Sequence, residues 1–349
     1  MRDLHEALRD PAAVTRLDLS RRSMETLPAE IGCFTALQSL DLRDNGLRAL
    51  PPELFRLRGL CVLYLDGNAL TSLAEAIGEL KRLEILSLHH NRLASLPAGL
   101  RTLPLLRFLG AANNELAALG PWIGELRQLE RLNLDGNRLR ELPPELGQLR
   151  ALRILSLRAN GLREVCGALA GARALEQLDL RENLLAAVPD ELGSLASLSW
   201  LRLASNRLRG LPSGVGRLRA LQKLDVSANR LLELPPVVFE LAALRELDAA
   251  GNLISEIPDG IARLPRLQRL ELGGNRIERI SPAIGGLRML RHVDVAGNLI
   301  RDLPAELGAL PALAVLDLSG NLLTRIPEPI ATAAGHLELR LDLNMLEEG

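Results

Sequence analysis

The chain has 349 residues with a formal net charge of -1, and 47% of its residues are hydrophobic while only 2% are aromatic. A near-neutral balance gives no general attraction to nucleic acid or to acidic membranes. The scarcity of aromatic side chains argues against an ordinary globular core of this size and favours a core built from layers of leucine.

The first element that the sequence predicts is a short helix within residues 3–10. Leu4, Ala7 and Leu8 share one helical face, and Pro11 is expected to end the run. We therefore expect residues 1–13 to form a helical cap over the first leucine layer. The segment is charged and lacks the apolar centre of a secretory signal. No stretch approaches the roughly 18 apolar residues of a membrane-spanning helix, so we expect no membrane insertion.

Residues 14–346 repeat one pattern of 23 residues, so we predict fifteen repeats, the last truncated, followed by a tail at 347–349. Residues 37–59 form one unit, LQSLDLRDNGLRALPPELFRLRG. In the first unit, Arg22 replaces the asparagine that marks all the others. Those asparagines are Asn45, Asn68, Asn91, Asn114, Asn137, Asn160, Asn183, Asn206, Asn229, Asn252, Asn275, Asn298, Asn321 and Asn344.

Each unit begins with alternating apolar and polar residues, which predict a short strand, and the asparagine then turns the chain. The Leu-Pro step leads to an outer segment, because proline does not fit inside a sheet ladder. A single unit cannot bury its apolar side, so stacked units share one core. The asparagine amide is expected to bond backbone groups of its own unit and of the neighbouring one. The predicted fold is a curved α/β solenoid with a parallel sheet on its concave face and short helical or irregular segments on its convex face.

The pattern LxxLxLxxNxLxxLPxxIGxLxx resembles the leucine-rich-repeat family over residues 14–346. It is similar to the 23-residue subclass of Ras-suppressor-like, Scribble-like and plant intracellular Ras-group proteins and of many bacterial repeat proteins. The resemblance implies a scaffold that binds a partner protein on its concave face, in intracellular signalling. Two alternatives stay open: a recognition module of a larger kinase, GTPase or ubiquitin ligase, and a bacterial effector that binds a host protein.

Catalytic motifs are missing from the sequence, which contains no GxxxxGK[ST], HExxH or GxSxG. We therefore predict no enzymatic activity and no cofactor. His89 and His90 form the one adjacent histidine pair, but no third ligand is evident, so we predict no metal site. Cys33, Cys61 and Cys166 are odd in number and widely spaced, which favours a reducing, cytoplasmic setting.

Charged residues also recur at fixed strand positions. We interpret one acidic column as solvated side chains that are common at this position of the repeat, rather than as a strip for a basic partner or a cation. Its members are Asp225, Asp248, Glu271, Asp294 and Asp317. Arginines on the middle units are interleaved with acidic residues, so we predict a protein partner and no nucleic acid, with the chain acting as a monomer.

The predicted binding surface consists of apolar, aromatic and arginine residues at sheet positions where a solvated face would be polar. Aromatic residues combined with arginine are typical of interface hot spots. We expect the centre to run from Tyr64 to Phe108, with Trp200 as a distal anchor six units from Tyr64. Trp122 is expected to pack locally on the outer arc. The candidate residues are Val62, Tyr64, Ile85, His89, His90, Phe108, Arg131, Ile154, Arg158, Trp200 and Arg202.

Overall fold

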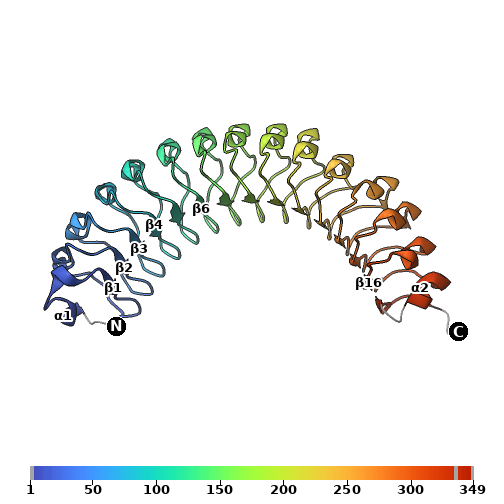
Figure 1. Ribbon diagram of the computed structural model, residues 1–349, viewed down its shortest axis with the longest axis horizontal. Helices are drawn as coiled ribbons and strands as arrows, with labels where there is room; N and C mark the ends of the chain where they lie inside the picture. Colours follow the sequence, from blue (N-terminus) through green and yellow to red (C-terminus); the bar gives the residue numbers. More distant parts are fainter. Residues whose placement is uncertain (1–3, 334–336, 347–349) are drawn as a thin grey trace. The chain divides into compact units, whose positions relative to one another are not determined.

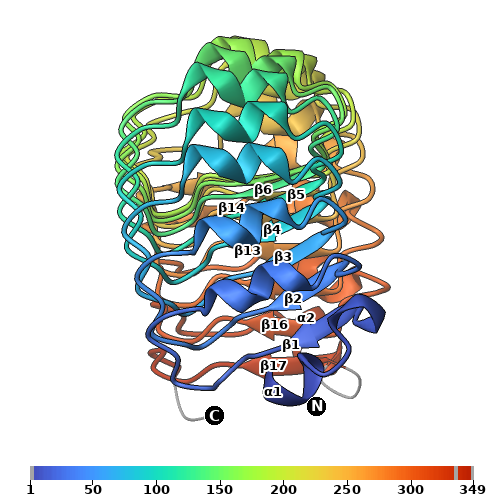
Figure 2. The same ribbon diagram turned by 90° about the vertical axis from the view of Figure 1, so that its left-hand side faces the viewer.

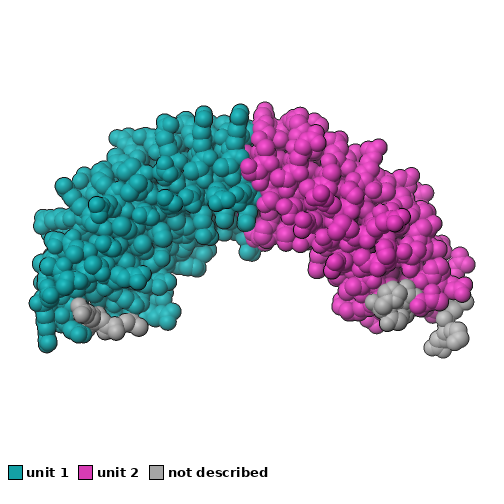
Figure 3. Space-filling view, in the orientation of Figure 1, with its two compact units in different colours: residues 1–178 teal, residues 179–349 magenta. Residues whose placement is uncertain are grey.

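A computed structural model describes residues 4–333 and 337–346 of the chain. The chain divides into two compact units, residues 1–178 and residues 179–349 (Figure 3). The tail expected at 347–349 lies outside the described residues. Within each unit the repeats form a curved solenoid, with strands on the inner side and short turns on the outer side (Figure 1). The solenoid prediction is therefore confirmed.

Unit 1 opens with helix α1 (Leu4–Ala7), in which Leu4 and Ala7 are buried. The helix is shorter than expected, and Pro11 does not end it but begins a separate 3-10 turn, η1 (Pro11–Ala13). Proline fits there because a first helical position needs no N–H donor. The strands then succeed one another in chain order (Figure 2). They are β1 (Arg16–Asp18), β2 (Ser39–Asp41), β3 (Val62–Tyr64), β4 (Ile85–Ser87), β5 (Phe108–Gly110), β6 (Arg131–Asn133) and β7 (Ile154–Ser156).

The unit boundary falls within β8 (Gln177–Asp179). Unit 2 continues with the same parallel arrangement and ends beyond a second short helix, α2 (Glu328–Ala333). Its main strands are β9 (Trp200–Arg202), β10 (Lys223–Asp225), β11 (Glu246–Asp248), β13 (Arg269–Glu271), β15 (His292–Asp294), β16 (Val315–Asp317) and β17 (Glu338–Arg340).

The outer segments of the repeats are regular 3-10 turns rather than irregular coil. In unit 1 they are η2 (Ala29–Cys33), η3 (Pro52–Arg56), η4 (Glu75–Glu79), η5 (Ala98–Thr102), η6 (Pro121–Glu125), η7 (Pro144–Gln148) and η8 (Gly167–Gly171). In unit 2 they are η9 (Asp190–Ser194), η10 (Ser213–Arg217), η11 (Pro236–Glu240), η12 (Asp259–Arg263), η13 (Pro282–Gly286) and η14 (Ala305–Ala309). Unit 2 also contains a small second sheet in which β12 (Glu256–Ile257) pairs with β14 (Arg279–Ile280).

The strand register brings equivalent positions of successive repeats side by side. Val62 faces Ile85, for example, and Leu63 faces Leu86, 23 residues further on. Leu63 and Leu86 are wholly buried, whereas Val62 and Ile85 are half-exposed on the opposite face. Each sequence column therefore becomes a physical column of side chains, either in the leucine core or on the open inner face.

The asparagines form the predicted ladder. Asn114 is buried, and its Nδ2 donates hydrogen bonds to the carbonyl oxygens of Leu88 (2.9 Å) and Ala111 (3.1 Å). Its Oδ1 accepts a hydrogen bond from the backbone N–H of Leu93 (3.0 Å). The same arrangement recurs at the equivalent asparagines of both units. A second feature of this turn is that the residue before the asparagine has a positive φ, as at Asn113 (56°) and His90 (54°). Glycine, asparagine and aspartate tolerate this conformation best.

Candidate protein-binding surfaces

The inner face of unit 1 carries a cluster that we call the aromatic patch: Tyr64, Ile85, His89 and Phe108. Tyr64, Ile85 and Phe108 lie on β3, β4 and β5, and all are half-exposed. Val62 lies beside Ile85 on the neighbouring strand. Because these strands are adjacent and about 4.8 Å apart, the patch crosses about 10 Å of sheet. The structure thus brings together the residues expected to form the centre of the binding surface.

The imidazole of His89 is held in one orientation across the strands. Its Nδ1 accepts a hydrogen bond from the backbone N–H of Ala112 (2.9 Å), and its ring meets Phe108 edge-on at a centroid distance of 6.2 Å. A Cβ at Gly110 would collide with both rings, so glycine at this strand position makes the contact possible. Burial lowers the pKa of His89, which keeps the ring neutral at physiological pH.

Arginines surround the patch. The guanidinium carbon of Arg43 lies 4.9 Å from the centre of the Tyr64 ring, and that of Arg131 lies 5.6 Å from the centre of Phe108. Such cation–π contacts hold the rings while leaving them in contact with solvent. Aromatic side chains flanked by arginine are the chemistry of interface hot spots.

The remaining unit 1 candidates lie near the patch without joining it. His90 is exposed and its Nε2 is 3.4 Å from Nδ2 of Asn113, so the two adjacent histidines face different neighbours. Ile154 follows Arg131 in the strand register, and Arg158 is exposed in the turn that follows β7. In residues 4–333 and 337–346, no three histidine, cysteine, aspartate or glutamate side chains are arranged to hold a metal ion.

The outer-arc tryptophan behaves as expected. Trp122 lies in η6 and is buried, and its indole packs so closely over Gly120 that a Cβ there would collide with it. It therefore contributes to local packing and not to an exposed surface.

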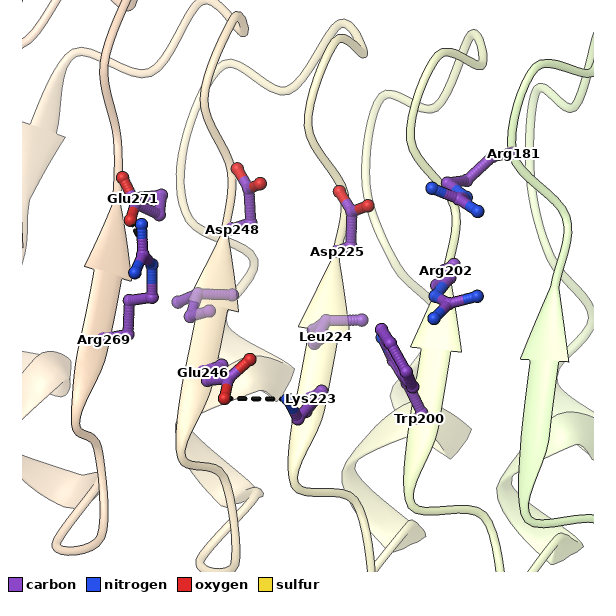
Figure 4. A pocket seen from close by; sticks show the side chains of 11 residues that line it. Arg181, Trp200, Arg202, Lys223, Leu224, Asp225, Glu246, Asp248, Arg269 and Glu271 are labelled. Carbon is purple, nitrogen blue, oxygen red and sulfur yellow. Dashed lines mark ion pairs between the residues drawn. The ribbon is translucent and has the colours of Figure 1, made fainter.

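Unit 2 contains a groove of about 380 Å³ that begins at Trp200 (Figure 4). The guanidinium carbon of Arg202 lies 3.2 Å from the centre of the indole, and Nζ of Lys223 lies 5.1 Å from it. Lys223 also pairs with Glu246 at 2.9 Å. The groove continues along β10, β11 and β13 past three carboxylates that stand at the same level: Asp225, Asp248 and Glu271.

The two arginines at the groove's entrance are anchored by one buried carboxylate. Arg202 and Arg181 lie 3.0 Å and 2.6 Å from Oδ2 of Asp179. Burial opposes ionisation of Asp179, but hydrogen bonds from Arg181 and Arg202 outweigh it and lower the pKa of this carboxyl. The predicted residues Trp200 and Arg202 therefore belong to a structured site of unit 2.

The acidic column, interpreted above as solvated, is partly buried at Asp248 and Glu271. The Glu271 side chain is only 14% exposed, and burial raises its pKa against the opposing effect of Arg269. Burial likewise raises the pKa of Asp248, and the neighbouring Asp225 adds to the effect. The groove itself was not predicted, although a recurring acidic position beside a tryptophan was a signal for it.

Parallel strands stacked in register, a leucine core, an asparagine ladder and an open sheet face define a leucine-rich-repeat solenoid. Family models for leucine-rich repeats match residues 35–93, 128–149 and 169–279. A leucine-rich-repeat protein of Leptospira interrogans is 35% identical, with a TM-score of 0.87 over 99% of this chain and 94% of its own. The chain belongs to the leucine-rich-repeat family. No curated protein matches its sequence.

Two receptors share the fold at lower identity. A TDR receptor is 28% identical with a TM-score of 0.78, and a plant peptide hormone receptor in complex with RGF2 is 28% identical with a TM-score of 0.72. The matches cover 97% and 92% of this chain but only 57% of each receptor chain. The fold indicates protein–protein interaction. Among the described residues, no helix has the length and apolar character needed to cross a bilayer.

Proposed function

We propose that the protein is a non-catalytic scaffold that binds a partner protein through the inner sheet face, with the aromatic patch of unit 1 as its main contact. The observation that carries this proposal is the patch itself. Tyr64, Ile85 and Phe108 are half-exposed on adjacent strands, at positions where most other repeats place charged or polar side chains. Arginines hold the two rings in place.

Rigidity supports the same proposal. The patch lies on paired strands rather than on a mobile loop, and the hydrogen bond from Ala112 fixes His89. A partner that covers these rings would therefore lose little side-chain entropy on the scaffold's side of the interface. Together with the arginines, the patch offers apolar contact area at its centre and hydrogen-bond donors at its rim, as protein interfaces commonly do.

We further propose that the protein works in intracellular signalling, in the cytoplasm. The three cysteines support a reducing compartment, since all are free thiols, with Cys33 exposed and Cys61 and Cys166 partly accessible. Such thiols persist best where glutathione keeps them reduced. Measurement of the thiol state in the protein recovered from cells tests this part of the proposal.

The experiment is the double substitution of Tyr64→Ser with Phe108→Ser, followed by circular dichroism and by quantitative cross-linking to partners in cells. We expect an unchanged spectrum and a loss of partners of tenfold or more, since hot-spot residues commonly contribute about 2 kcal/mol or more each. Leu105→Ser is the matched control, because Leu105 is an exposed apolar residue of the same unit outside the patch. Retention of all partners by the folded double variant would contradict the proposed function.

A further inference from the structure

Five carboxylates form a continuous row on the inner face of unit 2, which we call the acidic row. The strand register pairs Asp225 with Asp248, Asp248 with Glu271, Glu271 with Asp294, and Asp294 with Asp317. With strands about 4.8 Å apart, the row is about 19 Å long. Like charges directly opposite one another on adjacent strands destabilise a sheet. The row therefore costs stability, and a cationic occupant would relieve that cost.

Two other aspartates at this strand position, Asp41 and Asp179, have a counterion of their own, whereas Asp18 is bonded by Ser20. Arg43 donates hydrogen bonds from Nε to both oxygens of Asp41 (2.9 and 3.0 Å), and Arg181 does the same for Asp179 (3.0 and 3.1 Å). In each case the arginine stands two residues after the aspartate. In the acidic row that place is taken by small residues that cannot neutralise the carboxylate: Ser227, Ala250, Gly273, Ala296 and Ser319.

In the described part of the chain, the end of the row beside the groove, at Asp225 and Asp248, carries no counterion of its own. Asp225 accepts hydrogen bonds from the backbone N–H and hydroxyl of Ser227, and Asp248 accepts one from the backbone N–H of Ala250. Within the described residues no ion pair forms to Asp225 or Asp248. Lys223, the nearest lysine along the sequence, pairs with Glu246 instead.

Further along the row, compensation is present but incomplete. Arg269 and His292 both lie against Oε1 of Glu271, yet this wholly buried oxygen accepts no hydrogen bond of good geometry. At the end of the row, Arg340 lies 3.3 Å from Asp317 and also pairs with Glu338. The cations that line the groove are already paired with other carboxylates: Arg202 with Asp179, Lys223 with Glu246 and Arg269 with Glu271. Asp225 and Asp248 are therefore left without a counterion of their own among the described residues beside the groove (Figure 4).

The groove gives the row a specific place for an occupant. Its floor includes Leu224, its aromatic wall is Trp200, and its acidic side carries Asp225 and Asp248. A volume of about 380 Å³ lies at the lower end of the range of small-ligand sites, which is room for side chains and not for a folded domain. The chemistry is complementary to a long cationic side chain, whose head pairs with carboxylates while its stem contacts apolar surface.

We propose that the groove and the acidic row bind an extended, arginine- or lysine-containing segment of a partner protein. One cationic side chain lies between Asp225 and Asp248, a neighbouring residue of the segment contacts Trp200, and further cations follow the row. A basic peptide fits better than a bare metal ion, since the described carboxylates do not form a metal cage. Nucleic acid is repelled by the row. The proposal rests on the proposed function only in taking a protein as the occupant.

The test is fluorescence anisotropy with a dye-labelled nonapeptide of alternating glycine and arginine and the full chain. We expect saturable binding that weakens as salt rises, and no binding of the matching peptide with glutamate in place of arginine. The double variant Asp225→Asn with Asp248→Asn should bind the arginine peptide at least about tenfold more weakly. Asparagine keeps the oxygen that accepts the backbone N–H, so the fold should survive, which circular dichroism checks.

The matched control is the double variant Asp18→Asn with Asp41→Asn, which makes the same charge change at the same column of unit 1. Its peptide affinity should stay within about twofold of the wild type. Equal weakening by both double variants would reveal only diffuse electrostatic attraction and would overturn the proposal, as would the absence of peptide binding. The Tyr64→Ser and Phe108→Ser variant should bind the peptide normally, so failure of this inference is distinguishable from failure of the proposed function.

Discussion

Replacement of Asn114 by alanine tests how much the asparagine ladder contributes to the fold. Asn114 is 7% exposed, and its side chain makes its main hydrogen bonds with three backbone groups: it donates to the carbonyls of Leu88 and Ala111 and accepts from the N–H of Leu93. Alanine removes these bonds and introduces no steric conflict. Any loss of stability can therefore be traced to particular donors and acceptors.

The three backbone groups differ in whether they keep a hydrogen-bond partner after the substitution. The Leu88 carbonyl still accepts a hydrogen bond from Asn91 (3.1 Å), and the Ala111 carbonyl still accepts one from Asn137 (2.9 Å). The N–H of Leu93 loses its partner and stays buried. An orphaned buried donor costs about 1–3 kcal/mol, and each lost bond to a carbonyl that keeps a second donor costs about 0.5 kcal/mol. We expect a total loss of about 3 kcal/mol.

Urea unfolding followed by far-ultraviolet circular dichroism measures this loss. Asn344→Ala is the control, because Asn344 also accepts from a backbone N–H and donates to two carbonyls but is only partly buried. Water can replace its bonds, so the control should lose less than about 1 kcal/mol. If Asn114→Ala lost no more stability than this control, the ladder would not hold successive repeats together in the way that its geometry indicates.

Three other substitutions test the charge and packing of the two units. The pKa of Asp248 is raised in the folded state, so its carboxyl contributes stability at low pH that is lost as pH rises through the folded pKa. Asp248→Asn should therefore raise the free energy of unfolding at pH 7 by about 0.5–1 kcal/mol and leave it unchanged near pH 3. Thermal melts at both pH values measure the difference. His89 has a lowered pKa and an Nδ1 that accepts a backbone N–H, so its contribution to stability is present above pH about 6.5 and is lost as pH falls through the folded pKa. His89→Gln should therefore reduce the difference between the urea midpoints at pH 7 and pH 5. An unchanged difference would contradict this role. A Cβ on Gly147 would collide with the backbone carbonyl of Ala168, so Gly147→Ala should cost about 1–3 kcal/mol in urea unfolding, while Gly210→Ala, with open space around it, should cost less than half as much.

Features that recur every 23 residues could be predicted, because each column of the pattern is repeated many times over. The strand register, the leucine core and the asparagine ladder all follow from that regularity. The small sheet of β12 and β14 could not be predicted from the common pattern. It forms where Ile257 and Ile280 replace the usual leucine before the outer turn. A β-branched residue at this position is not sufficient for the pairing, because Val165 and Val188 occupy it in two successive repeats that form no such strands.

The candidate sites were predicted unequally for a similar reason. The aromatic patch was found because Tyr64 and Phe108 are conspicuous in columns of polar residues. The position of His89 over the strands could not be predicted, since it depends on the absence of a side chain at Gly110. The signal for the acidic row was the lack of an arginine two residues after each carboxylate. This signal becomes evident only from the structure, in which Arg43 neutralises Asp41.

The sharing of carbonyls along the asparagine ladder also governs how such a chain can change in length. A deletion of residues 115–137 would join Asn114 to Arg138 and leave each remaining amide opposite a carbonyl of the right kind. A deletion one residue shorter would place an aliphatic side chain where the next amide must donate. Relatives of this protein should therefore differ in length by whole repeats, gained or lost through duplication and recombination. The length of the binding face should change in the same steps.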